Sequence, residues 1–159
     1  MGMLVAFASD DGERIAPHLS KATAFLLYDL TWPAPVEDGA PRGRTSRGRR
    51  AAAERGPSQA SEILFVGVRQ AERPKPDPRR QGCGGHSEGE SVHHASVLAA
   101  LDHVDALVCC RLGLGLLRDL EFLGVAVYPS SVDTVAEALE LLTREGLEAD
   151  YSRVCRCGR

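Results

Sequence analysis

The segment from Leu4 to Leu30 constrains the fold most strongly, because it places two apolar runs on either side of a polar turn. Leu4 to Ala8 is short and continuously apolar, which is typical of a strand buried on both faces of a sheet. Ala24 to Leu30 mixes aromatic and apolar residues and predicts a second strand. We therefore expect an antiparallel pair of strands joined by the polar turn.

The turn between these strands carries a histidine. Asp11-Gly12 is a strong turn dipeptide, and Pro17 has no backbone N–H to offer a neighbouring strand. The pattern therefore predicts that His18 lies at the rim of the sheet. Imidazole is a good ligand for iron and other borderline metals, and a rim position leaves its nitrogens accessible. A solvated histidine without a ligand is the alternative interpretation.

Composition limits the class of protein. The 159 residues are 43% hydrophobic, which suits one domain with a single core. Two of the five cysteines, Cys109 and Cys110, are adjacent inside an apolar run, and no signal peptide precedes the first strand. We therefore expect a reducing cytoplasm rather than a disulfide framework. No apolar run near the start approaches the roughly 20 residues of a membrane-spanning helix, so we expect no membrane partner.

Two stretches lack the periodicity of helices and strands. Residues 33–60 are rich in Pro, Gly, Arg, Ser and Ala and are predicted to be a disordered basic insert. The block from Arg42 to Arg55 has no aromatic residues for base stacking, so we expect a solvated segment without a nucleic-acid partner. A glycine-rich loop contains Cys83 and His86 at a C-x-x-H spacing that could chelate one metal. A mobile loop with incidental ligand types is the alternative.

The rest of the chain alternates strands with helices. In chain order, the patterns predict a strand at 62–68, a helix that begins at 92, a strand at 106–110, a helix at 113–124, a strand at 125–128 and a helix at 132–146. The result is a mixed α/β fold of five strands and three helices, in the order β-β-β-α-β-α-β-α, within a single domain over residues 1–146. Residues 147–159 show no pattern and are predicted to be a flexible tail, in which Cys155 and Cys157 could chelate a soft metal.

Strand directions predict where the turns gather. Antiparallel links reverse the first three strands in turn, and helical crossovers keep the third, fourth and fifth parallel. We therefore expect the His18 turn, the loop with Cys83 and the turn at Gly113 and Gly115 to converge at one edge of the sheet. Open α/β sheets tend to bind ligands at such an edge. The basic insert is expected at the opposite edge.

The Gly113 and Gly115 turn has the chemistry of an anion site. The first N–H groups of a helix have no partner within the helix and lie at the positive end of its dipole. Arg111 precedes this turn and could pair with the same anion. A tight strand-to-helix turn without a ligand is the alternative.

Several segments resemble those of a known family. They read Val5-Ala-Phe-Ala-Ser-Asp-Asp-Gly, Ile15-Ala-Pro-His-Leu-Ser-Lys-Ala, Phe25-Leu-Leu-Tyr-Asp, Gly82-Cys-Gly-Gly-His, Asp105-Ala-Leu-Val, Gly124-Val-Ala-Val-Tyr and Thr134-Val-Ala-Glu-Ala-Leu. The family is the dinitrogenase iron-molybdenum cofactor biosynthesis domain. The resemblance implies a ribonuclease-H-like fold and a non-enzymatic carrier or assembly accessory for iron-sulfur-based metalloclusters in nitrogen fixation. It also implies that proteins that donate or accept the cluster are the partners.

The resemblance assigns a role to one residue. The histidine of the family's His-Phe-Gly turn, a candidate cluster ligand, corresponds to His18, although the turn here reads His18-Leu19-Ser20. An iron-sulfur or iron-molybdenum-type cluster is the implied cofactor. Together with the residues discussed above, the predicted cofactor-binding set is His18, Arg111, Gly113 and Gly115, and the predicted metal ligands are His18, Cys83 and His86.

Two other functions stay open. The first is an interaction protein of the same fold that has lost metal binding. The second is a metal-dependent hydrolase, for which Asp10, Asp11 and Asp29 would have to form an acidic metal site. The first two carboxylates fall in a turn and the third lies near the far end of the second strand, which is a poor arrangement for two metal ions. We therefore expect no enzymatic activity.

Overall fold

The structure is a computed structural model that describes residues 2–32, 62–72, 88–144 and 146–156. Its main sheet has the strand order β3-β2-β1-β4-β6. The strands are β1 (Gly2–Ala8), β2 (Ala24–Thr31), β3 (Glu62–Gln70), β4 (Ala106–Cys109) and β6 (Ala126–Pro129), and the helices are α1 (Glu88–Ala100), α2 (Leu114–Phe122) and α3 (Val135–Arg144). The predicted mixed α/β fold of five strands and three helices is confirmed.

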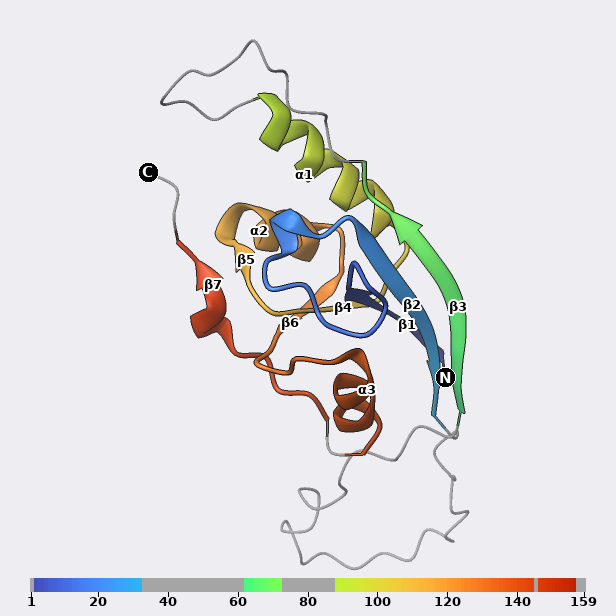
Figure 1. The fold of residues 1–159 in the computed structure, drawn as a ribbon. Coiled ribbons are helices and arrows are strands. Elements are labelled where there is room, and N and C mark those ends of the chain that lie inside the picture. Colours follow the sequence, from blue (N-terminus) through green and yellow to red (C-terminus); the bar gives the residue numbers. More distant parts are fainter. Residues whose placement is uncertain (1, 33–61, 73–87, 145, 157–159) are drawn as a thin grey trace, which may run out of the picture.

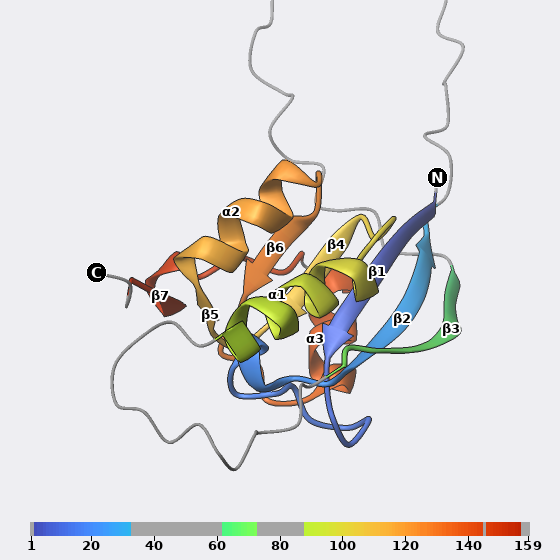
Figure 2. The same ribbon diagram turned by 90° about the horizontal axis from the view of Figure 1, so that it is seen from above.

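The helices lie on both faces of this sheet. Figures 1 and 2 show α1 and α2 over one face and α3 over the other. Each face has its own apolar cluster, and β1 contributes to both because its side chains alternate between the two faces. Ala6 and Ala8 face α1 and α2, whereas Val5 and Phe7 face α3. All four are fully buried, as expected of a strand covered on both faces.

Strand pairing follows the predicted directions. β2 is antiparallel to both β1 and β3. β4 is parallel to β1, and β6 is parallel to β4. β1, β3, β4 and β6 therefore run in the same direction, so the turns that follow β1 and β4 emerge at the same edge of the sheet. This edge carries the candidate site.

The helix boundaries have local causes. α3 begins at Val135, after the predicted Val132, because Thr134 Oγ1 caps the helix by accepting the Glu137 backbone N–H at 3.2 Å. Val135, Ala138 and Leu142 form its buried face, whereas Ala136 is exposed. α1 begins before Val92, and it ends at Ala100, whose carbonyl oxygen accepts Arg69 Nη1 of β3 at 3.1 Å. An arginine at the last carbonyls of a helix stabilises that end.

One part of the fold was not predicted. β5 (Leu112–Gly113) and β7 (Val154–Cys155) form a second, two-stranded parallel sheet. Gly113 opens α2 as its N-cap residue, as predicted, and it also ends β5, which was not predicted. Residues 147–159 were predicted to be a flexible tail, and the short helix η2 (Tyr151–Arg153) and β7 lie within this segment. Such short elements carry no periodicity from which they could be predicted.

Two predictions fall outside the described residues: the basic insert at 33–60, and the loop that contains Cys83 and His86. Both therefore stay predictions, as do the domain boundary at residue 146 and the assignment to a ribonuclease-H-like fold. Within the ranges that the structure describes, no helix is long and apolar enough to cross a membrane.

Candidate functional site

The candidate site is built from the turns that follow β1 and β4. His18 immediately precedes the short helix η1 (Leu19–Lys21). The Leu19 backbone N–H donates to the carbonyl oxygen of Arg111 at 2.7 Å, and Arg111 precedes β5. This bond joins the His18 turn to the segment that leads into α2. The predicted convergence of His18 with the Gly113 turn is therefore confirmed.

His18 is held in place by its neighbours in the turn. Its backbone is extended, and its Nδ1 accepts the Ser20 backbone N–H at 3.3 Å. Ser20 Oγ lies 2.7 Å from the same nitrogen. The next residue, Leu19, is fully buried and anchors the turn in the core. These contacts fix the imidazole ring and direct its other nitrogen, Nε2, away from the turn.

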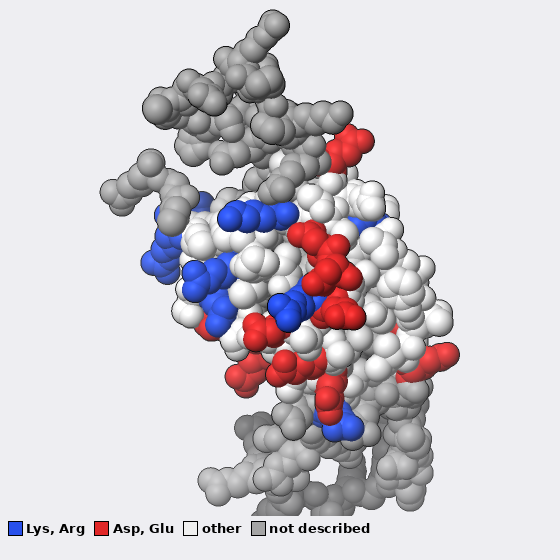
Figure 3. All heavy atoms as spheres, in the orientation of Figure 1, with Lys and Arg blue, Asp and Glu red and all other residues white. Residues whose placement is uncertain are grey.

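The surroundings of His18 favour its neutral form. Burial lowers the pKa of His18 below its usual value of 6.5, and the positive charges of Lys21 and Arg111 lower it further. A neutral imidazole is the form that binds metal. Figure 3 shows Lys and Arg side chains gathered over β5 and β7, on the left of the view, while Asp and Glu side chains cover the middle and lower part. An anionic ligand would therefore meet positive charge at this edge.

The first turn of α2 lies beside the histidine turn. Gly113 is the N-cap residue, with φ −76° and ψ 149°, and no side chain caps the helix there. A Cβ atom added to Gly113 or Gly115 would have no heavy atom within 4 Å, so the helix start is open. Free N–H groups at the positive end of a helix dipole favour a negative ligand. The two glycines and His18 thus lie at one edge, as predicted, and their role in binding stays a prediction.

A thiol that sequence reasoning had placed in a flexible tail also reaches this edge. β7 runs parallel to β5, and Cys155 is the register partner of Gly113. Cys155 Sγ lies 3.6 Å from His18 Nε2. The two residues are 137 positions apart in the chain. No short motif links them, so their proximity could not have been found from the sequence.

The other two described thiols differ from Cys155. Cys109 is fully buried, and burial together with the neighbouring Cys110 raises its pKa to about 12. It packs as a small apolar residue, as predicted. Cys110 is partly buried, and its Sγ accepts Arg153 Nη1 at 3.4 Å. Cys155 is therefore the described thiol that faces His18.

The acidic residues are engaged in holding the turn. Asp10 Oδ1 accepts the Thr23 backbone N–H at 2.7 Å. Asp11 Oδ1 accepts the backbone N–H groups of Glu13 and Arg14 at 2.9 and 2.8 Å, which lowers the pKa of Asp11 below its usual 3.8. In the described part of the chain, no group of three or more His, Cys, Asp or Glu residues is placed to hold a metal ion. The hydrogen bonds of Asp10 and Asp11 thus serve to hold the turn and the start of β2 in place.

Two solved structures are similar to this chain at low sequence identity. One is a crystal structure from Methanocaldococcus jannaschii, named as a candidate dinitrogenase, at 13% identity and a TM-score of 0.49, with 90% of this chain and 89% of that chain covered. The other is a solution structure from Thermotoga, named as a candidate NifB protein, at 18% identity and a TM-score of 0.47, with 98% and 99% covered.

No curated protein matches the chain. The sequence model of one family, described as dinitrogenase iron-molybdenum cofactor, matches residues 1–145. This match contains β1 to α3 and ends before β7. Because it spans most of the 159 residues, the chain belongs to the dinitrogenase iron-molybdenum cofactor family.

Proposed function

We propose that the protein is a non-enzymatic carrier or assembly accessory that holds an iron-sulfur-based metallocluster, such as a nitrogenase cofactor precursor, at the edge formed by the ends of β1 and β4. The observation that carries this proposal is the bond between Leu19 and Arg111, which brings the His18 turn against the segment leading into α2. Imidazole can ligate iron at the surface of a cluster. The open N-terminus of α2 and the nearby Lys21 and Arg111 offset the negative charge of the cargo.

Few protein ligands suit a carrier. A carrier has to release its cargo to an acceptor, and each additional ligand slows that release. A site with few protein ligands and compensating positive charge holds an anionic cluster while leaving most of its surface free for the next protein. The partners are therefore proteins that donate or accept the cluster, and we place the protein in the cytoplasm, where its thiols stay reduced.

The test is cluster retention by the full chain. The protein is incubated anaerobically with iron and sulfide under reducing conditions and desalted, and its iron, sulfide and visible absorption are then measured. We expect His18→Ala to lose most of the bound iron with unchanged far-UV circular dichroism. The matched control is His94→Ala, because the His94 imidazole of α1 hydrogen-bonds Asp119 of α2, which is not one of the predicted site residues. Equal iron in wild type and His18→Ala would disprove the role of this residue.

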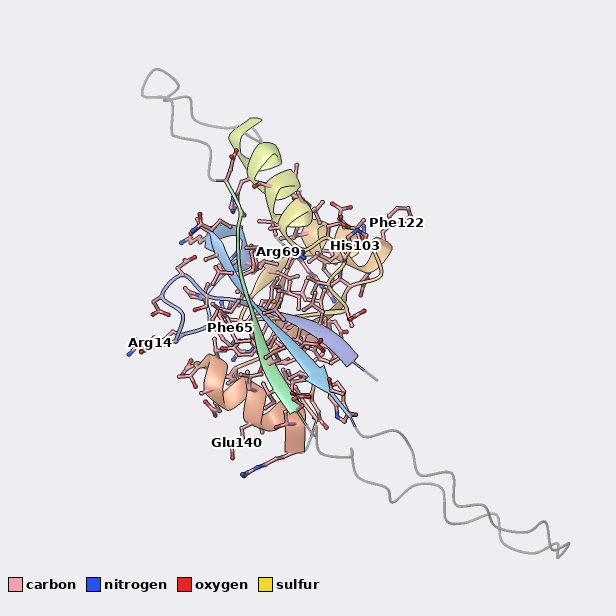
Figure 4. The ribbon with its side chains drawn as sticks, turned by 90° about the vertical axis from the view of Figure 1, so that its right-hand side faces the viewer. Arg14, Phe65, Arg69, His103, Phe122 and Glu140 are labelled. Carbon is pink, nitrogen blue, oxygen red and sulfur yellow. The ribbon has the colours of Figure 1, made fainter. Side chains whose placement is uncertain are left out.

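A second candidate function is an interaction protein that binds no metal. β3 favours it, because this outermost strand of the sheet exposes 47–57% of Ile63, Leu64, Phe65, Val66 and Val68. Figure 4 looks onto this strand, with Phe65 labelled near its middle. Exposed apolar surface of this kind is typical of protein contacts. Absence of iron and of absorption in the wild-type protein, together with a loss of partner binding in Leu64→Lys, would favour this function over the carrier.

A further inference from the structure

We propose that Cys155 is a second ligand at this edge, so that the thiolate of Cys155 and the imidazole of His18 bind the same iron or other borderline divalent metal. This inference rests on the proposed carrier function only for the identity of the bound cargo. Metal binding by the pair does not depend on that function, because it can be tested with a simple ion. Cys155 lies beyond residue 145, where the family match ends, so the pair is a feature of this chain rather than of the matched segment.

The distance between the two ligand atoms fits a shared metal. In a tetrahedral site, metal–nitrogen bonds of about 2.0–2.1 Å and metal–sulfur bonds of about 2.3 Å separate the two ligand atoms by roughly 3.6 Å. Cys155 Sγ and His18 Nε2 are 3.6 Å apart. The hydrogen-bonded thiol and imidazole are therefore spaced like two ligands of one tetrahedral metal ion.

The thiol is positioned by the fold. Asp150 begins η2, with its backbone N–H donating to the Pro129 carbonyl oxygen at 2.7 Å and its Oδ1 accepting the Ser152 N–H at 3.1 Å. Val154 packs against the core cluster that α1 and α2 cover. The pairing of β7 with β5 then sets Cys155 opposite Gly113, at the start of α2. The negative charge of a metal thiolate is favourable at this end of a helix.

The imidazole has a neighbour that can support ligation. In the structure Nδ1 accepts the Ser20 backbone N–H, so the proton of the neutral ring is on Nε2. For Nε2 to bind a metal, this proton has to move to Nδ1, which then needs an acceptor in place of the Ser20 N–H. Ser20 Oγ lies 2.7 Å from Nδ1 and can accept that proton's hydrogen bond. Metal binding then releases the thiol proton of Cys155 to solvent, while the proton of a neutral His18 stays on the ring. Ser20 is therefore a positioning residue and not a ligand.

The experiment uses Co²⁺ as the probe and the full chain under anaerobic, reducing conditions. Co²⁺ bound to a thiolate gives a sulfur-to-metal charge-transfer absorption in the near ultraviolet, which imidazole alone does not give. We expect wild type to show this band. Cys155→Ser should lose the band and bind Co²⁺ at least about tenfold more weakly, because losing a direct ligand should cost no less than losing an outer contact.

Cys110→Ser is the matched control, because Cys110 lies at the same edge and contacts Arg153 instead of His18. It should keep the band, and all variants should keep their thermal unfolding midpoints. A full band in Cys155→Ser, or equal loss in Cys110→Ser, would overturn the proposal.

Failure of the carrier function would look different: wild type would bind Co²⁺ through the thiolate and yet retain no iron-sulfur cluster. If Cys155→Ser instead retained as much cluster and as much Co²⁺ as wild type, the pair would fail while the carrier function stood.

Discussion

The main sheet presents opposite chemistry in two regions. At the β3 side, Leu64 and Phe65 are apolar and about half exposed. At the edge formed by the ends of β1 and β4, the side chains are those of His18 and Cys155, with arginines around them. The first region can bury apolar area against another surface, whereas the second can bind metal and negative charge. The difference teaches that a strand's apolar sequence does not reveal whether it lies in the core, while the direction of the strands does predict where polar turns meet.

The strongest test of this comparison makes the same substitution in both regions. Leu19 is fully buried beneath the His18 turn, whereas Leu64 on β3 is 57% exposed. Leu19→Ala should lower the free energy of unfolding by about 2–5 kcal/mol, because it leaves a cavity in the core. Leu64→Ala should change it by no more than about 0.5 kcal/mol. Urea denaturation of the two variants measures both values, and equal losses would show that β3 is covered.

A second test concerns the role of Ser20 in metal binding by His18. Ser20→Ala removes the hydroxyl beside Nδ1 of His18. We expect Co²⁺ affinity to fall about tenfold, as is common for the loss of an outer contact to a metal-binding histidine. Ser131→Ala, at an exposed position after β6, is the control. The two affinities are compared by titration of the cobalt absorption. An unchanged affinity in Ser20→Ala would show that the serine only shapes the turn.

Acid should lower the stability of the fold through Asp11, which lies in the turn that leads to His18. The pKa of Asp11 is lowered in the fold by the Arg14 and Glu13 backbone N–H groups, so the folded state favours the carboxylate. The resulting stabilisation is complete above the unfolded value of about 3.8 and is lost as pH falls through the lower, folded value. Asp11→Asn should therefore be less stable than wild type at neutral pH. The difference in stability between the two proteins should become smaller as the pH falls. Thermal unfolding from neutral pH downward measures this, and a difference independent of pH would contradict it.

The smallest expected effect lies on β3. Leu64→Lys places a charge on an already exposed side chain, so stability should change by no more than about 0.5 kcal/mol. Binding of an apolar fluorescent dye should fall, and Co²⁺ binding should stay at the wild-type level. Dye fluorescence and cobalt titration of the same sample provide both readouts. A loss of Co²⁺ binding would mean that the two regions are coupled, against the separation described above.

Much of the fold could be predicted because its signals are local. The continuous apolar run at β1 and the capping residue Thr134 act over a few neighbours, and the rules for connections then fix the strand directions. These directions were enough to predict that the His18 turn lies near Gly113. The exposure of β3 could not be predicted, because its apolar run reads like that of a buried strand. The contact between Cys155 and His18 depends on a two-residue strand and a separation of 137 positions, for which the sequence offers no pattern.

The ladder between β5 and β7 has a mechanical consequence. It pairs only two residues on each strand, Leu112 with Val154 and Gly113 with Cys155, whereas β1 and β2 pair over seven. A pull on the segment after η2 would therefore peel β7 away long before it disturbed the main sheet. Peeling takes the sulfur away from the imidazole and leaves His18 in its turn. A protein that binds this segment could thus separate Cys155 from His18 without disturbing the main sheet.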